Sequence, residues 1–211
     1  DLVTWILRDT PNWGPAQRVR ADLVIHPRSD WGADLVPGPL ETEPDVRFLL
    51  VHHTAGRNEY TREQVRDQLR EVFTYHTGPE KGWSDVCYNF FVDRFGRLYE
   101  GRAGGMDRNV LGGHTAGFNE NTFAVAAIGD FDTTKPNATD YAAIQESVSK
   151  LFAWKFALNH ADPTASATLT SNSSAGTSKY SAGTSVTVPA VMGHRDIGST
   201  DCPGAALYSA I

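Results

Sequence analysis

Two short segments of the chain carry residue types that bind metal ions in proteins. His52 and His53 follow each other at the end of an apolar run, and Cys202 lies eight residues after His194, with mostly turn-forming residues between them. Neutral imidazole and cysteine thiolate suit a tetrahedral Zn²⁺ site, and three protein ligands leave the fourth position for water, as in catalytic sites. If the intervening loop folds back, His194 and Cys202 converge on one metal ion.

An alternative interpretation of the same residues stays open. The two cysteines, Cys87 and Cys202, also fit one disulfide bond, with His194 as an ordinary surface group. Successive side chains of a strand point to opposite faces, so we expect at most one of His52 and His53 to point cleanly into a given site. The spacing alone does not choose between a metal site and a disulfide bond.

Composition and charge exclude several classes of protein. The chain has 211 residues, 40% of them apolar, and 19 basic against 25 acidic residues give a net charge of −6. This charge provides no basic field for nucleic acid or an anionic membrane. Apolar runs such as 123–129 are far shorter than the roughly 20 residues that cross a bilayer. We expect one main domain, with no nucleic-acid partner and no membrane insertion.

The elements that must position these residues follow from the apolar pattern. Residues 47–53 form an apolar run without alternation, which predicts a central strand covered on both faces. A capping-box pattern followed by apolar residues at helical spacing predicts a helix at about 61–76. A turn between two β-prone segments predicts a hairpin over 85–101. Residues 1–30 lack a sustained period and predict an extended lead-in.

The second half of the chain continues the same alternation. Residues 102–121 are too rich in glycine for a helix or strand and predict a long shaped loop. A strand at 122–128 and a second helix within 137–160 follow. Residues 164–188 are rich in Ser, Thr and Gly with β-prone arms, which predicts an inserted exposed hairpin. The fold class is therefore α/β, with a mixed central β-sheet flanked by helices.

Six ordered motifs together resemble the peptidoglycan recognition protein family, also called type 2 N-acetylmuramoyl-L-alanine amidases. They are RSDWGA at 28–33, VHHTA at 51–55, GWSDVCYNF at 82–90, YEGR at 99–102, GHTAGFN at 113–119, and GHRD at 193–196 with TDCPG at 200–204. The inserted hairpin resembles actinobacterial members in particular. The resemblance implies an amidase domain over 27–211, with residues 1–26 as an N-terminal extension or linker.

The resemblance also implies a cofactor and catalytic residues. By motif position the zinc ligands are His52, His194 and Cys202, and the catalytic hydroxyl groups belong to Tyr88 and Thr200. Zinc held in this way lowers the pKa of a water molecule towards about 7 and supplies a nucleophile at neutral pH. The hydroxyl groups are expected to donate hydrogen bonds to the developing oxyanion. The implied reaction is hydrolysis of the amide between N-acetylmuramic acid and L-alanine.

The implied partner is peptidoglycan or a muropeptide. The residues that match the substrate groove of the family are His53, Thr54, His76, Lys81, His114 and Asn119. We expect a secreted or wall-associated monomer whose signal peptide has been removed. A module that only binds peptidoglycan is the alternative, although such members typically lack the cysteine. Zinc binding by Cys202 further predicts that it is not paired with Cys87.

Overall fold

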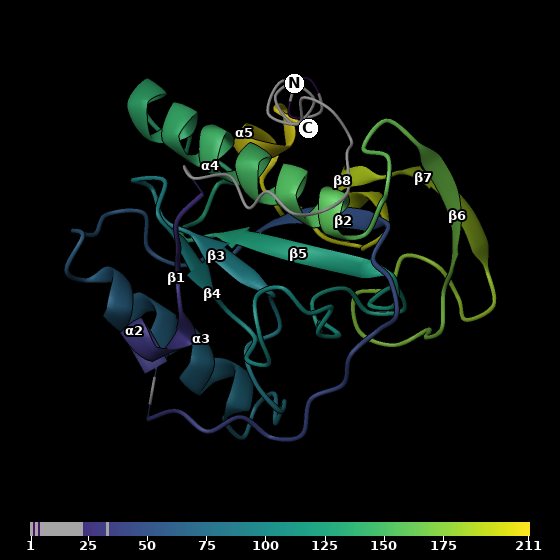
Figure 1. Cartoon of the computed structure of the whole chain (residues 1–211), viewed down its shortest axis with the longest axis horizontal. Helices are drawn as coiled ribbons and strands as arrows, with labels where there is room; N and C mark the ends of the chain where they lie inside the picture. Colours follow the sequence, from purple (N-terminus) through teal and green to yellow (C-terminus); the bar gives the residue numbers. More distant parts are fainter. Residues whose placement is uncertain (1, 3, 5–22, 33) are drawn as a thin grey trace.

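A six-stranded mixed sheet forms the centre of the structure, a computed structural model that describes residues 2, 4, 23–32 and 34–211 (Figure 1). In spatial order the strands are β1 (Ile25–His26), β4 (Leu98–Glu100), β3 (Phe90–Val92), β5 (Thr122–Ala127), β2 (Phe48–His53) and β8 (Val191–Gly193). Neighbouring strands are parallel except for the antiparallel pair β3 and β4. The predicted α/β class with a mixed sheet is confirmed.

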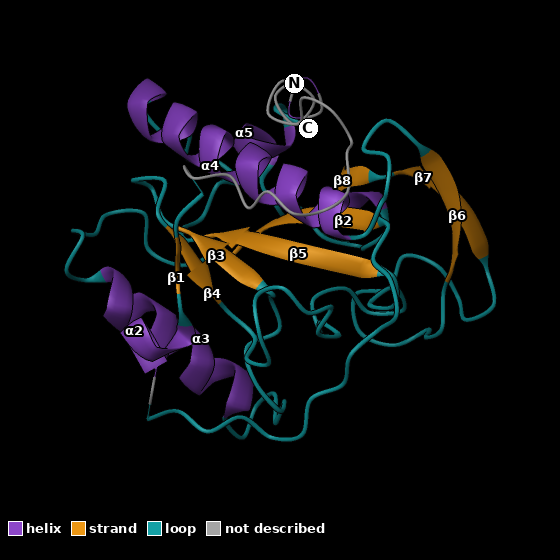
Figure 2. Ribbon diagram, in the orientation of Figure 1, coloured by secondary structure: helices purple, strands orange, loops and turns teal. Residues whose placement is uncertain are grey.

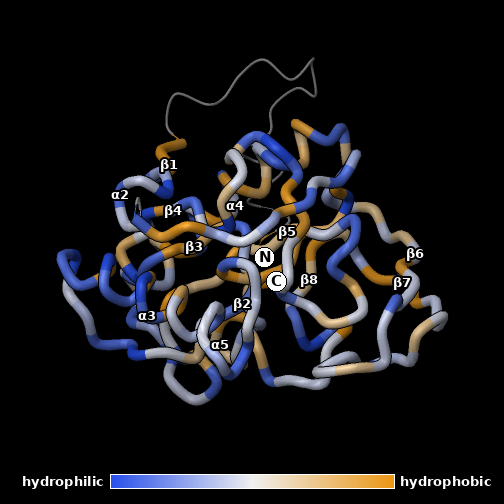
Figure 3. The backbone as a smooth tube through the Cα atoms, turned by 90° about the horizontal axis from the view of Figure 1, so that it is seen from below, coloured by the Kyte–Doolittle hydropathy of each residue, from blue (hydrophilic) through white to orange (hydrophobic). Residues whose placement is uncertain are grey.

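Helices cover both faces of this sheet (Figure 2). The long helix α4 (Ala138–Leu158) lies along one face, and α2 (Arg28–Gly32) and α3 (Val65–Thr77) lie against the other. A short 3-10 helix, η1 (His194–Asp196), and α5 (Ala205–Tyr208) follow β8. Figure 3 shows the sheet strands coloured mainly as hydrophobic and α3 mainly as hydrophilic, because α3 lies at the surface with one buried side.

Strand β2 matches the predicted buried strand, since all six of its residues are buried. Leu49 and Val51 pack in the cluster that includes α4, whereas Phe48 and Leu50 pack in a cluster on the other face. The strand is interior but lies next to the edge strand β8, so β5 is closer to the middle of the sheet.

Both predicted helices are present. Asn137 caps α4, because its Oδ1 accepts the N–H of Asp140 at 3.0 Å. The first helix, α3, begins four residues later than predicted, at Val65, after a turn in which the Thr61 N–H donates to Gln64 Oε1 at 2.8 Å. This bond is one half of the predicted capping box.

The predicted loop and hairpins are also present. The hairpin over 85–101 is β3 and β4, and the inserted hairpin is a separate two-stranded sheet of β6 (Ser166–Thr170) and β7 (Ser185–Pro189). Residues 102–121 form no helix or named strand. The buried Lys155 of α4 fastens this loop, because its Nζ donates to the carbonyl oxygens of Met106 and Arg108 at 3.4 and 3.2 Å.

The extended lead-in predicted for residues 1–30 is wrong from Ile25 onward. Ile25 pairs with Leu98 in the main sheet, and α2 follows. The guanidinium of Arg28 forms a buried ion pair with Asp85, with nitrogen–oxygen distances of 2.9 and 3.1 Å. These elements are too short to show a period, so long-range contacts hold them. Most of the expected extension, residues 1–26, lies outside the described residues.

Candidate metal centre and active site

His52, His194 and Cys202 meet at one end of the sheet. One ligand atom of each lies within 4.8 Å of the others, and all three residues are buried. His52 lies near the end of β2, and His194 directly follows β8, the parallel neighbour of β2. Parallel pairing places the carboxyl ends of both strands at one edge, which is where sites gather in such sheets. The turn after η1 then brings Cys202 to the same place.

The geometry of these three side chains fits a zinc ion. Bonds of about 2.3 Å to sulfur and about 2.0 Å to nitrogen at a tetrahedral angle place two ligand atoms about 3.5 Å apart. Cys202 Sγ lies 3.6 Å from His52 Nδ1. Among the described residues, the buried Nε2 atoms of His52 and His194 have no hydrogen-bond partner. The protein alone therefore leaves a polar atom of each ring unsatisfied.

Burial also sets the protonation of the three groups. Burial lowers the pKa of His52 well below its usual value and that of His194 to about 4, so both imidazoles are neutral, as metal ligands must be. Burial raises the pKa of Cys202 to about 12. A bound metal cation reverses this effect, because a coordinating thiol is deprotonated. The backbone N–H of His53 also donates to Cys202 Sγ at 3.4 Å.

The disulfide alternative is wrong, because Cys87 and Cys202 are both free. Cys87 is buried, and its Sγ lies 3.9 Å from Nε2 of His76 rather than near a second sulfur. Burial raises the pKa of the Cys87 thiol above its usual value, so it is a small neutral group within the fold.

Two hydroxyl groups lie beside the three ligand side chains. The ring of Tyr88 is 5.2 Å from that of His52, and its hydroxyl donates to the His53 carbonyl at 3.4 Å. Burial raises the pKa of Tyr88 well above its usual value, so the phenol keeps its proton. Thr200 Oγ1 accepts the N–H of Cys202 at 3.2 Å. The hydroxyl proton of Thr200 is therefore available to another acceptor.

Two of the expected groove histidines surround this centre. The ring of His114 packs edge-on against His52 at 5.1 Å, and burial lowers the pKa of His114 to about 3. His76 lies on the other side of Tyr88, with ring centroids 5.7 Å apart, and its Nδ1 accepts the N–H of Cys87 at 3.2 Å. Both rings are neutral and mostly buried, so each presents only a small area to a ligand.

The remaining groove residues differ in exposure. Lys81 is exposed, with its Nζ 5.4 Å from the ring of Tyr75 and 5.3 Å from the ring of Trp83. Thr54 Oγ1 accepts the N–H of Gly129 at 3.0 Å. Asn119 Oδ1 accepts the N–H of Thr115 at 2.8 Å, which shapes the glycine-rich loop.

Sequence reasoning missed Tyr75 and Trp83, which are 51% and 40% exposed near this centre. The ring of Trp83 lies 4.9 Å from that of His76 at a tilt of 46°, and His76 in turn contacts Tyr88. The sequence did contain a signal for both residues. Trp83 lies in the GWSDVCYNF motif and Tyr75 directly precedes His76, so each is an aromatic residue next to an expected site residue or within a site motif.

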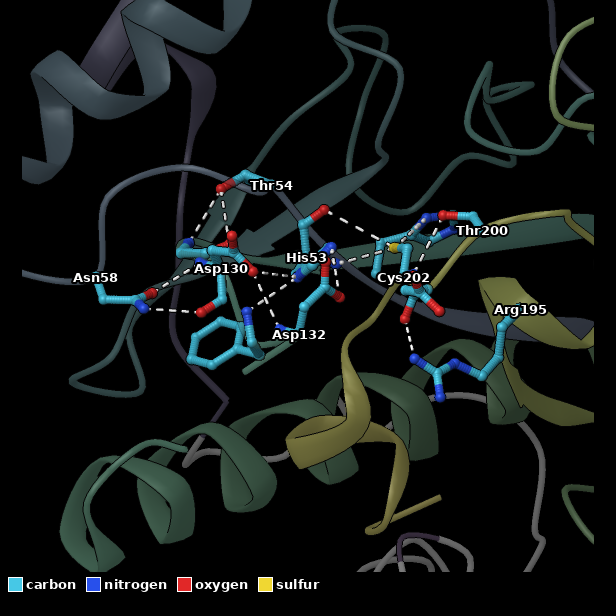
Figure 4. A network of polar contacts seen from close by, with 12 residues as sticks. His53, Thr54, Asn58, Asp130, Asp132, Arg195, Thr200 and Cys202 are labelled. Atoms are coloured by element: carbon cyan, nitrogen blue, oxygen red, sulfur yellow. Dashed lines mark hydrogen bonds and ion pairs between the residues drawn. The ribbon is translucent and has the colours of Figure 1, made fainter. Parts of the chain in front are cut away.

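His53 is the one expected site residue whose ring is separated from the others. It points to the opposite face of β2, where it lies between Asp130 and Asp132 (Figure 4). Its Nδ1 accepts the N–H of Phe131 at 3.1 Å, so the proton of the neutral ring is on Nε2, which lies 3.8 Å from Asp132 Oδ1. The two carboxylates were missed, although both follow β5, the parallel neighbour of β2.

Among the described helices, none has the length and apolar character to cross a membrane. A family model described as N-acetylmuramoyl-L-alanine amidase matches residues 42–205. The chain therefore belongs to the family of peptidoglycan recognition proteins and type 2 N-acetylmuramoyl-L-alanine amidases. Its members act on or bind peptidoglycan.

Three relatives illustrate the likeness. Peptidoglycan-recognition protein SC2 of Drosophila melanogaster is 28% identical over 196 residues, which cover 93% of this chain and 88% of that protein. The human N-acetylmuramoyl-L-alanine amidase is 30% identical over 189 residues, which cover 87% of this chain and 27% of that protein. The structure of human PGRP-IBETAC in complex with glycosamyl muramyl pentapeptide is 28% identical, covers 89% of this chain and 93% of that one, and has a TM-score of 0.65.

Proposed function

We propose that the protein is a zinc-dependent amidase that hydrolyses the amide between N-acetylmuramic acid and L-alanine in peptidoglycan. The observation that carries this proposal is the complete group of His52, His194 and Cys202, buried and spaced for zinc, with two hydroxyl groups beside it. A zinc ion held there supplies an activated water nucleophile and polarises the scissile carbonyl.

The chain's own residues supply the rest of the chemistry. Tyr88 keeps its proton and donates it in a long, 3.4 Å bond to the His53 carbonyl, so it can redirect this proton to a developing oxyanion. Thr200 offers a second donor, because its oxygen is already oriented by the N–H of Cys202. The surrounding buried side chains exclude water, which strengthens these hydrogen bonds.

The proposed substrate contacts extend from this centre towards the surface. Lys81 is an exposed cation beside the ring of Trp83, and it can pair with a carboxylate of the stem peptide. We further propose Thr54, His76, His114 and Asn119 as residues of the substrate groove, whereas the ring of His53 points to the other face of β2, towards Asp130 and Asp132. The glycosamyl muramyl pentapeptide bound by human PGRP-IBETAC supports a ligand of this class.

Digestion of purified peptidoglycan tests the proposal directly. The wild-type protein with zinc should release stem peptides from muramyl glycan, detected by mass spectrometry, and a chelator should abolish the release. Binding to peptidoglycan that a chelator does not change, without any released product, would instead support the non-catalytic alternative, which the recognition-protein relatives make relevant. All proposed zinc ligands come from one chain, so we propose that the protein acts as a monomer. We also propose that it acts outside the cytoplasmic membrane, secreted or bound to the cell wall, because its proposed substrate is peptidoglycan.

A further inference from the structure

The connecting loop of the inserted hairpin, residues 171–184, lies against two segments of the candidate active site. We refer to it as the bracing loop. The hairpin itself is anchored by the buried side chains of Leu169 and Val188, which pack with Phe48 and Met192 of the main sheet. The loop therefore starts and ends on strands that are fixed to the core.

The first segment that it contacts is the turn from His194 to Cys202, which carries Thr200. The Lys179 N–H donates to the Ile197 carbonyl at 3.2 Å, and the Ser199 N–H donates to the Thr177 carbonyl at 2.8 Å. Ser178 and Gly198 form an antiparallel bridge between these bonds. A short stretch of the bracing loop thus pairs with the turn as a strand would.

This pairing holds the backbone of Gly198, which contacts the imidazole of the proposed zinc ligand His194. A methyl group added to Gly198 would lie 2.7 Å from both Cδ2 and Nε2 of His194, so the backbone of Gly198 touches the imidazole directly. The Gly198 N–H also donates to the His194 carbonyl at 2.8 Å. A shift of the Gly198 backbone towards the His194 ring would therefore displace that ring, and a shift away from it would remove its support.

The second segment is the glycine-rich loop, which carries His114. The Asn172 N–H donates to the Gly117 carbonyl at 2.9 Å, and Asn172 Nδ2 donates to Glu120 Oε1 at 3.0 Å. Gly117 has a φ of 84°, and an added methyl group there would lie 2.5 Å from Ser171 Oγ. The close fit leaves no room for a side chain between the two loops.

The interior of the bracing loop is ordered by its own hydrogen bonds. Ser171 is 1% exposed, and its Oγ lies 2.8 and 3.2 Å from the carbonyl oxygens of Ser173 and Tyr180, between which its single hydroxyl proton is shared. The ring of Tyr180 meets that of Phe118 edge-on at 6.1 Å. A low-complexity composition usually gives a flexible linker, whereas these contacts fix the loop between two walls of the site.

We propose that the bracing loop is a positioning element of the metal centre. It holds the turn from His194 to Cys202 at a fixed distance from the glycine-rich loop that packs His114 against His52. This inference rests on the proposed zinc site. Outer contacts that orient metal ligands typically change metal affinity or activity by about 10–100-fold when they are removed.

A matched pair of variants at Lys179 tests the inference in the full chain. Lys179→Pro removes the N–H that donates to Ile197, and proline suits the extended Ser178 before it. Lys179→Ala removes the same side chain, including its 3.4 Å bond from Nζ to the Arg195 carbonyl, but keeps the N–H. A third variant replaces residues 172–182 by Asn-Gly, which closes the hairpin but removes Thr177, Ser178 and Lys179, the residues that pair with the turn from His194 to Cys202.

Three measurements follow each variant: zinc affinity by chelator competition, kcat and KM on a muropeptide, and amide hydrogen exchange over residues 195–202. We expect Lys179→Pro and the shortened loop to weaken zinc affinity by about tenfold or more and to lower kcat, with KM changed less than about twofold and faster exchange at 197–199. Lys179→Ala should remain within about twofold of wild type in each quantity.

The result that would overturn the inference is wild-type zinc affinity in Lys179→Pro although exchange shows that the pairing has been lost. Equal losses in Lys179→Pro and Lys179→Ala would also overturn it, because the side chain would then be responsible. A wild-type protein that binds zinc more tightly than Lys179→Pro but cleaves no muropeptide would disprove the proposed amidase and leave the positioning role standing. A wild-type protein that binds no zinc would disprove both.

Discussion

The end of β2 presents two groups of ligand-type side chains on its two faces. On one face His52 meets His194 and Cys202, and on the other His53 meets Asp130 and Asp132. In both groups the ligand atoms lie within 4.8 Å of one another. The residues of the first group are buried, whereas the side chains of Asp130 and Asp132 are 48% and 40% exposed.

The difference between the two groups lies in what their atoms already bind. Nδ1 of His53 is occupied by the N–H of Phe131, so its proton is on Nε2, and that proton faces a carboxylate instead of leaving a lone pair for a metal. Nδ1 of His52 faces the Cys202 sulfur, and Nε2 of His52 has no partner among the described residues. Short distances between ligand-type residues are thus insufficient evidence of a metal site. The hydrogen bonds that these atoms already make within the protein decide which lone pairs remain free to bind a metal ion.

Removing the sulfur ligand should have the largest effect. We expect Cys202→Ser to lower kcat/KM by more than about 10³-fold and to reduce bound zinc well below one ion per chain by elemental analysis. Cys87→Ala, at the other buried thiol, is the control and should keep both zinc and activity. Full zinc content in Cys202→Ser would show that the first group is not the metal site.

Tyr88 tests whether the His52 face carries the chemistry. Tyr88→Phe removes one hydrogen-bond donor to the oxyanion, which should lower kcat by about 10²–10³-fold, with zinc content unchanged. Tyr141→Phe is the matched control, because Tyr141 is a partly buried phenol of α4 that packs against the core, and it should leave kcat within about twofold. An unchanged kcat in Tyr88→Phe would remove this residue from the mechanism.

His53 tests the other face. His53→Ala leaves the buried N–H of Phe131 without its acceptor, which should cost about 1–3 kcal/mol in the free energy of unfolding, measured by urea denaturation. His53→Asn offers an oxygen in place of Nδ1 and should recover much of this loss. Both variants should still bind one zinc ion per chain, and loss of that ion would contradict the assignment of the two faces.

The last effect concerns pH and a buried histidine that lies outside both groups. Burial, aided by the positive charge of Lys81, lowers the pKa of His76 to about 4. Between about pH 6.5 and pH 4 the unfolded chain therefore binds a proton at His76 that the folded chain does not. The free energy of unfolding should fall in this window as pH is lowered, by up to about 1.4 kcal/mol per pH unit from this residue. His76→Gln should make the fall less steep in urea titrations of the metal-free protein.

The pattern of residues predicted much of the framework. Helical spacing located α3 and α4, and the unbroken apolar run located β2, because burial periodicity is a local property of the sequence. The alternation of strand side chains also anticipated that His52 and His53 would point to opposite faces. The strand β8, with three residues, has no such pattern and is defined by its pairing with β2.

By itself the sequence determined the α/β class, the family resemblance and the ligand-type residues that its motifs contain. Only the tertiary structure brought His52 and Cys202, 150 positions apart, to within 3.6 Å, left both cysteines free and placed the bracing loop against the turn between His194 and Cys202. The physical reason is that helix and strand patterns reflect short-range sterics and burial, whereas these contacts depend on the parallel pairing of β2 with β8 and on which hydrogen bonds the packed neighbours leave unfilled.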